Sequence, residues 1–177
     1  DGRWKSKTKV VRFPVPAAEA YRGPRPDEVQ TVAIDRSNLL IEVYFRTGSS
    51  DGILVKKKDN AGYQLMLKDG RVGFEVENQA GKVLSVESKA RVNDGKWQHV
   101  VAEVDRAEGA TLYLNGQAHA RTKGELGGSL GNRSDFYVGG TANGDNVAVV
   151  LDFLRVARGT LTDARTTIDE LYAWQCD

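Results

Sequence analysis

A hairpin signal in the middle of the chain constrains the fold more than any other sequence feature. Residues 63–77 read YQLMLKDGRVGFEVE, in which apolar and polar residues alternate on both sides of Asp69-Gly70. Asp-Gly between two alternating runs is typical of a tight β-hairpin, because both central residues must adopt positive φ. The alternation directs one set of residues toward a core: Leu65, Leu67, Val72, Phe74 and Val76. The opposite face receives Gln64, Lys68, Arg71, Glu75 and Glu77.

Short alternating runs of this kind recur from Val29 onward, with turn signals between them. In NLLIEVYFRT the residues of one face are Leu39, Ile41, Val43 and Phe45, and those of the other are Leu40, Glu42, Tyr44 and Arg46. In KWQHVVAEVD the core face takes Gln98, Val100, Ala102 and Val104, and the other takes Trp97, His99, Val101, Glu103 and Asp105. Roughly ten to twelve strands at this spacing predict an all-β fold, a two-sheet antiparallel β-sandwich.

The two ends of the chain depart from this pattern. All four prolines fall in residues 1–28, a basic lead-in with one expected strand in KVVRF and then an irregular loop. At the other end, residues 162–175 are predicted to form one helix packed on a sheet, with Thr162 as its cap. The apolar residues at helical spacing are Ile168, Leu171, Tyr172 and Trp174.

Composition limits the classes of protein to which the chain can belong. Its 177 residues suit a single domain, with the sandwich core at residues 29–161. The net charge of +1 favours neither nucleic acid nor a membrane surface as partner. No apolar run approaches the roughly 20 residues of a membrane-spanning helix. The single cysteine, Cys176, cannot form an internal disulfide, and we expect a monomer.

Three carboxylates in the stretch AEVDRAEGA raise the question of catalysis. Glu103, Asp105 and Glu108 are spaced E-x-D-x-x-E, which resembles the active-site signature of laminarinase-type and agarase-type glycoside hydrolases. A retaining glycosidase needs its two carboxyl groups on one face and about 5–5.5 Å apart. Glu108 precedes Gly109 in the predicted turn, so we expect it at the tip of the hairpin, pointing away from Glu103 and Asp105. We therefore interpret the row as a polar strand end and a charged turn.

Three motifs together resemble the laminin G-like, or concanavalin A-like, lectin/glucanase sandwich. They are NLLIEVYFRT, NDGKWQHVVAEVD with ATLYLNGQ, and LDFLRVARGTLT, in the family's order over roughly residues 29–172. The resemblance implies two antiparallel sheets, one of them concave, in a mostly non-catalytic binding module outside the cell. It also implies one stabilising Ca²⁺. Asp152 matches the family's recurrent acid and shares the parity of Leu154 and Val156, so we expect it to be buried beside a cation or an arginine.

Candidate binding residues come from the outward parity of the strands. Sugars are bound by flat apolar rings and by planar polar side chains that satisfy the hydroxyls. The residues that meet this description are Tyr44, Arg46, Gln64, Lys68, Arg71, Glu75, His99, Glu103, Tyr113 and Asn115. Their mixture suits an anionic or sulfated polysaccharide, bound at the concave face or at the loop rim. Lys56-Lys57-Lys58 is interpreted as a solvated edge that discourages pairing between sheets.

The expected function is non-catalytic binding of a polysaccharide, which would deliver an attached carbohydrate-active enzyme in a larger secreted or cell-surface protein. An extracellular protein–protein adhesion module, as in laminin and neurexin-type domains, is the alternative. A glycoside hydrolase that uses Glu103, Asp105 and Glu108 is a third hypothesis from a different class.

Overall fold

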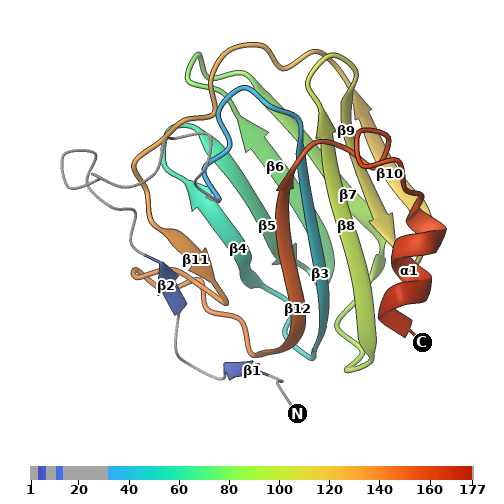
Figure 1. Cartoon of the computed structure of the whole chain (residues 1–177). Coiled ribbons are helices and arrows are strands. Elements are labelled where there is room, and N and C mark those ends of the chain that lie inside the picture. The colour runs from blue at the N-terminus through green and yellow to red at the C-terminus, as the bar shows by residue number, and fades with distance from the viewer. Residues whose placement is uncertain (1–3, 7–10, 14–31, 177) are drawn as a thin grey trace, which may run out of the picture.

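The structure is a sandwich of two antiparallel sheets with one C-terminal helix (Figure 1). It is a computed structural model, and it describes residues 4–6, 11–13 and 32–176. One sheet, here called the β3 sheet, has the order β1 (Trp4–Ser6), β12 (Val149–Arg158), β3 (Leu39–Thr47), β8 (Trp97–Asp105), β9 (Gly109–Leu114), β10 (Gln117–Lys123). The other, the β5 sheet, has the order β2 (Val11–Phe13), β11 (Phe136–Val138), β4 (Gly52–Lys58), β5 (Gly62–Lys68), β6 (Arg71–Glu77), β7 (Val83–Arg91). These strands confirm the predicted all-β sandwich.

The predicted hairpin is formed by β5 and β6. Lys68 pairs with Arg71, and the turn residues Asp69 and Gly70 have φ of 50° and 76°. A Cβ on Gly70 would lie 2.5 Å from the side chain of Asn93, so this turn residue is restricted both by its φ and by its neighbour. The strand expected in KVVRF is observed as β2, and the predicted loop at residues 14–28 lies outside the described residues.

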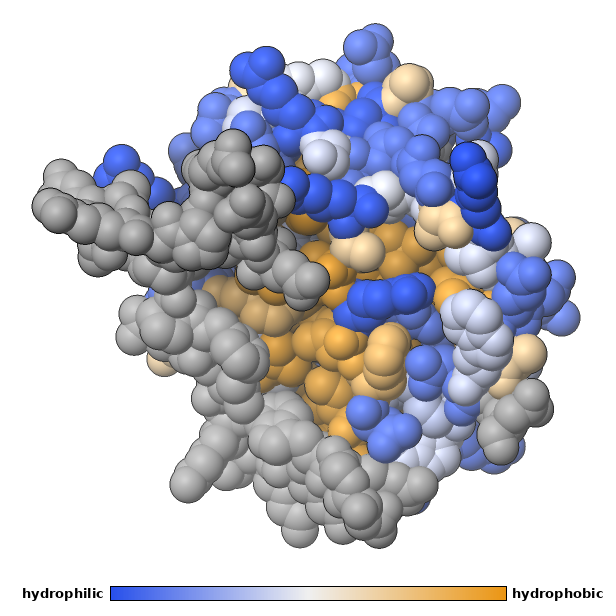
Figure 2. All heavy atoms as spheres, viewed as in Figure 1, coloured by the Kyte–Doolittle hydropathy of each residue, from blue (hydrophilic) through white to orange (hydrophobic). Residues whose placement is uncertain are grey.

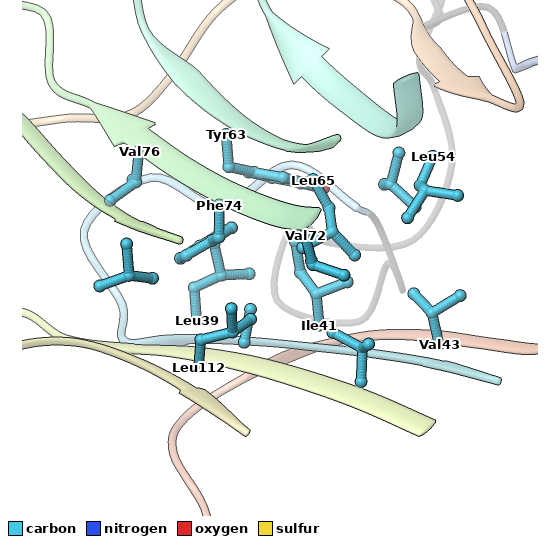
Figure 3. Close-up of a cluster of buried hydrophobic side chains, with 14 of the residues drawn as sticks. Leu39, Ile41, Val43, Leu54, Tyr63, Leu65, Val72, Phe74, Val76 and Leu112 are labelled. Carbon is cyan, nitrogen blue, oxygen red and sulfur yellow. The ribbon is translucent and has the colours of Figure 1, made fainter. Parts of the chain in front are cut away.

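The core lies between the sheets and contains the residues that the alternation directed inward. Figure 3 shows Phe74 and Val76 of the β5 sheet facing Leu39 and Leu112 of the β3 sheet. The predicted inward residues of β3, β5, β6 and β8 are all buried, including Gln98 near the start of β8, which keeps 7% of its surface. Period-2 patterning was therefore sufficient to assign the faces of these strands.

The two sheets are joined directly along one side of the sandwich, where β7 lies next to β10 (Figure 1). Thr122 Oγ1 donates to the Ser85 carbonyl at 2.6 Å, and the Lys89 amide donates to His119 Nδ1 at 3.1 Å. On the opposite side, the inward residues Leu151, Leu154 and Val156 of β12 are only partly buried. Figure 2 shows apolar residues at the surface in the middle of this view.

The lysine run on β4 is not the solvated edge that we expected. β4 pairs with both β5 and β11, so it lies inside the β5 sheet. Lys57 points inward, keeps 2% of its surface, and donates from Nζ to the Ser134 carbonyl at 2.9 Å. Lys58 lies on the outer face, where its Nζ is 2.6 Å from Glu77 and 3.3 Å from Glu75. The strand tolerates Lys57 and Lys58 because each of these two has polar partners.

The buried Lys57 makes the free energy of unfolding depend on pH in the alkaline range. Burial lowers its pKa from the ordinary 10.5, and Asp59 and Asp135 only partly oppose this effect. Between the lowered folded value and 10.5 the unfolded chain binds more protons, so the free energy of unfolding rises with pH. We expect Lys57→Met to remove this rise, as measured by urea unfolding of both proteins from pH 7 to 10.5. Parallel pH profiles for the two proteins would contradict this assignment.

A β-bulge in β12 overturns the expected position of Asp152. The register with β3 shifts between Leu151 and Phe153, so the intervening Asp152 drops out of the alternation and is exposed. Leu154 still faces inward opposite Val43. The prediction of a buried acid was wrong because simple parity assumes an unbroken strand, and a bulge adds one residue.

The C-terminal helix, α1, spans Ile168–Cys176, so it begins later than the predicted residue 162. Thr167 rather than Thr162 is its cap. The Glu170 amide donates to Thr167 Oγ1 at 3.3 Å, and the Thr167 amide donates to Glu170 Oε2 at 2.9 Å. This reciprocal capping box follows a turn in which Arg165 has φ of 54°, a conformation that excludes a continuous helix from Thr162. No described helix is long and apolar enough to cross a membrane.

Candidate functional site

The predicted binding residues divide between two opposite surfaces of the sandwich. One group lies on or beside the outer face of the β3 sheet: Tyr44, Arg46, His99, Glu103, Tyr113 and Asn115. The other group belongs to the β5–β6 hairpin of the β5 sheet: Gln64, Lys68, Arg71 and Glu75. The hydrophobic core separates the two groups, so they cannot contribute to a single site.

On the outer face of the β3 sheet, a buried ionisable cluster holds three strands together. His99 Nε2 of β8 lies 2.9 Å from Glu42 Oε1 of β3, and both side chains are almost fully buried. Arg155 of β12 donates from Nη2 to Glu42 Oε2 at 2.7 Å. Nε2 of the imidazole is therefore occupied within the sheet, Nδ1 has no hydrogen-bond partner among the described residues, and the ring is covered from solvent. His99, which the sequence offered as a candidate binding residue, serves here as a hydrogen-bonded structural residue.

The same face is covered by the C-terminal segment. Leu171 of α1 is buried against Leu40 and Val101. The ring of Tyr172 lies 5.8 Å from that of His99. These contacts confirm the prediction that the helix packs on a sheet, and they remove the middle of this face from ligands.

The polar groups around the helix also have structural partners. Glu103 accepts hydrogen bonds from the Tyr113 hydroxyl at 2.7 Å and from the Leu161 amide at 3.0 Å. Burial, and then the bond to Glu103, raise the pKa of Tyr113. Asn115 lies in the β9–β10 turn with φ of 49°, and its side chain bonds to the amide of His99 and to Gln98. These residues anchor the segment that precedes α1 and the turn beneath it.

Aromatic residues cluster at one end of the β3 sheet's outer face. The rings of Tyr44 and Trp97 stack with centroids 4.9 Å apart, and the Arg46 guanidinium lies 5.3 Å from the Trp97 centroid. All three side chains are half-buried. The cluster joins β3 to the start of β8, at the end of the strand where Trp97 lies.

The three carboxylates spaced E-x-D-x-x-E do not converge on one site, because each has different partners. Glu103 faces the segment before α1, where it accepts a hydrogen bond from the Leu161 amide. Asp105 caps the β8–β9 turn by accepting from the Ala107 amide at 2.9 Å and from the Glu108 amide at 3.2 Å. Glu108 is exposed at the tip and pairs with Arg121 at 2.7 Å. Each acid has a structural partner, as expected for a polar strand end and a charged turn.

The outer face of the β5 sheet carries a hollow that the sequence did not reveal. Gly73 of β6 faces outward between Met66 of β5 and Glu87 of β7. Because glycine lacks a side chain, the three strands leave a depression of about 260 Å³, bordered also by Lys68, Glu75 and Ser85. We call it the Gly73 hollow.

A polar row crosses the β5 sheet beside this hollow. Strand pairing places Lys56, Gln64, Glu75 and Ser85 side by side on β4, β5, β6 and β7. Gln64 Nε2 donates to Glu75 Oε1 at 3.2 Å. Burial acts to lower the pKa of Lys58, but its bonds to Glu77 and Glu75 outweigh this and raise it. The surface therefore combines an apolar thioether, carboxylates, an amide and an ammonium group around a concave floor.

The next feature is the arrangement of possible metal ligands in the described part of the chain. Within residues 4–6, 11–13 and 32–176, no group of three or more His, Cys, Asp or Glu side chains is placed to hold a metal ion. Asp152 is exposed on its bulge, so the buried donor on which the calcium expectation was based does not exist there. Calcium therefore stays an expectation from the resemblance alone.

Two packed antiparallel sheets with an open, concave outer surface define a lectin-like β-sandwich. The chain belongs to the concanavalin A-like lectin/glucanases superfamily, whose laminin G-type sequence model matches residues 28–165. This match confirms the resemblance derived from the three motifs.

Comparison with known proteins identifies relatives of the same fold. The Paraclostridial mosquitocidal protein 1 of Paraclostridium bifermentans is 26% identical over 72 residues, which is 36% of this chain and 6% of that protein. The crystal structure of its binding domain has a TM-score of 0.65 at 19% identity, covering 78% of this chain and 37% of the domain. The binding domain of botulinum neurotoxin serotype D has a TM-score of 0.67 at 15% identity, covering 98% of this chain and 42% of that domain. The chain thus spans about two fifths of these solved domains, and at such identities the likeness is one of fold.

Sequence reasoning missed the residues that shape both faces. Glu42 was placed on the outward face without a partner, and Arg155 was not considered, because only the β3–β12 register brings them together. Gly73 interrupts an alternating strand at an outward position, which is a signal for close approach of another chain or ligand. That signal was present in RVGFEVE and could have located the hollow.

Proposed function

We propose that this chain is a non-catalytic carbohydrate-binding module that binds a polysaccharide at the Gly73 hollow and the polar row beside it. The observation that carries this proposal is the concave outer surface of β5, β6 and β7, lined by Met66, Glu75 and Glu87. The fold belongs to a lectin and glucanase superfamily, and the related solved structures are described as binding domains. In the full protein the module would deliver an attached carbohydrate-active enzyme outside the cell.

The chemistry of the hollow suits a sugar ring. Its floor is backbone and the Met66 thioether, against which the C–H face of a sugar can pack. Glu75, Glu87 and Ser85 at its border can accept or donate hydrogen bonds to equatorial hydroxyls, whose burial without partners would be costly. Gln64, fixed by its bond to Glu75, adds a planar amide next to the hollow. Few side chains would have to become ordered on binding, since β6 holds the floor rigidly.

Gly73→Val is expected to weaken polysaccharide binding by roughly tenfold or more, because the new side chain would fill the hollow. Its fold should be retained: Gly73 has no left-handed φ, and its Cβ would meet Met66 Cγ at 3.4 Å, an ordinary contact. Gly48→Val is the matched control, since a Cβ there meets nothing within 4 Å. A glycan array would identify the ligand, and calorimetric titration of wild type and both variants would measure the change. Equal affinities of wild type and Gly73→Val for that ligand would remove the hollow from the site.

The alternative of a protein-adhesion module makes a different prediction in the same assay. It predicts that no glycan on the array is bound by the wild type, whatever residue occupies position 73. Among the residues that the structure describes, no contact favours a protein ligand over a glycan, so the adhesion module remains an outcome of the test.

A further inference from the structure

A second hollow lies at one end of the sandwich, among the segments that connect its strands. It has a volume of about 380 Å³ and is lined by Arg36, Arg106, Glu125, Gly127 and Gly128 among others. Three segments form it: the chain before β3, the β8–β9 turn and the loop after β10. We call it the rim hollow. It is separate from the Gly73 hollow, whose lining residues all come from β5, β6 and β7.

The Arg106 guanidinium has one nitrogen, Nη1, without a hydrogen-bond partner among the described residues. Its backbone amide bonds to Asn38 Oδ1 at 2.9 Å, and its Nη2 donates to the Gly128 carbonyl, so the guanidinium is held in place. Nη1 is buried and has no hydrogen-bond partner in the described part of the chain. Burial lowers the pKa of Arg106, and the nearby Asp35 carboxylate only partly opposes this. A fixed, desolvated guanidinium with a spare N–H is a strong donor for an oxyanion.

The other lining groups add donors around the same space. Arg36 is exposed and forms no ion pair within the described residues. The amides of Gly127 and Gly128 donate no hydrogen bond to any described residue, and Gly128 has φ of 75°. Consecutive free amides around a left-handed residue are typical of anion-binding loops. Glu125 in the lining and Asp35 beside Arg106 balance the charges of the two guanidinium groups, so the unpaired N–H donors rather than a net charge favour an anion here.

We propose that the rim hollow binds an oxyanion, a sulfate or carboxylate group, between Arg106, Arg36 and the Gly127-Gly128 backbone. Free inorganic sulfate and a substituent of a polysaccharide share this chemistry. If the oxyanion belongs to a polysaccharide, the inference rests on the proposed function. The anion site itself does not depend on the Gly73 hollow. A sulfated or uronate-bearing glycan would then be distinguished from a neutral one at the rim.

Titration of ¹⁵N-labelled protein with sodium sulfate, at ionic strength held constant with sodium chloride, tests the site directly. We expect saturable shifts of the Gly127 and Gly128 amide signals. Arg36→Gln should weaken sulfate binding roughly tenfold, as expected for one charge-assisted contact. Arg106→Lys should weaken it similarly, because lysine keeps the charge but loses the planar fork. Arg158→Gln, an exposed residue at the end of β12, is the charge-matched control and should have no effect.

Shifts that do not saturate, or equal weakening by Arg158→Gln, would show general screening and overturn the proposal. Dextran sulfate and unsulfated dextran then separate the two sources of the oxyanion. Tighter binding of dextran sulfate than of inorganic sulfate, lost in Arg36→Gln, identifies a glycan substituent. Saturable sulfate binding with no response to dextran sulfate would keep the anion site and reject the glycan as its source. Neutral-glycan binding without any sulfate response would keep the proposed function and reject the rim site.

Discussion

Replacing Phe74 with alanine is expected to lower the free energy of unfolding by about 4 kcal/mol. Phe74 keeps 1% of its surface and lies between the sheets, where Figure 3 shows it above Leu39 and Leu112. Its removal loses the transfer free energy of the ring and leaves a cavity that β-sheet backbones cannot collapse to fill. Urea unfolding with an unchanged m-value would measure the loss.

Two controls make the Phe74 result specific. Phe74→Leu retains most of the volume and should cost only about 1.5 kcal/mol. Val83→Ala, at a side chain that is 43% exposed, should change the stability by less than about 0.5 kcal/mol. A loss in Val83→Ala comparable to that in Phe74→Ala would mean that the sheets are not packed as described.

Glu42→Ala is the second substitution with a large expected effect, a loss of about 3 kcal/mol. The carboxylate joins His99 and Arg155 across three strands, and its removal leaves the buried imidazole and part of the guanidinium unpaired. Removing one partner of a buried pair costs more than the pair itself contributes, because the remaining groups stay desolvated. The change would be measured by thermal and urea unfolding at pH 7.

Glu42→Gln distinguishes the loss of hydrogen bonds from the loss of packing. Glutamine keeps an oxygen for Arg155 and supplies an amide to the imidazole, so we expect it to retain more than half of the stability that Glu42→Ala loses. If Glu42→Ala cost less than about 1 kcal/mol, the cluster would not hold the strands together, and His99 would again be a candidate for ligand binding.

The strands and their faces could be predicted from the sequence because each depends on local periodicity. Leu39, Ile41, Val43 and Phe45 needed only the period-2 rule, and Asp69-Gly70 needed only the turn rule. Features that depend on pairing between distant strands were not predictable in this way. The bulge at Asp152 exists only relative to β3, and the inward position of Lys57 depends on the loop that supplies the Ser134 carbonyl.

For the candidate site as well, the sequence predicted what depends on local periodicity and missed what depends on the arrangement of distant strands. Parity correctly directed Gln64 and Glu75 outward on one strand pair, but it could not say that Tyr44 and His99 faced the opposite side of the sandwich. The topology that separates them is fixed by strand order, which a single sequence does not reveal. The cover of the β3 sheet by α1 was expected as helix packing, yet its consequence for His99 and Glu103 required the contacts of Tyr172 and Leu161.

Affinity electrophoresis tests the central claim, non-catalytic polysaccharide binding through the Gly73 hollow, most directly. Wild type, Gly73→Val and Gly48→Val would be run through gels containing neutral and sulfated polysaccharides, with and without EDTA, and each glycan would be assayed afterwards for new reducing ends. We expect at least one glycan to retard the wild type and Gly48→Val but not Gly73→Val, without degradation of the glycan. Loss of retardation in EDTA would add calcium to the site. Free migration of the wild type through every gel, or cleavage of the retarding glycan, would contradict the account.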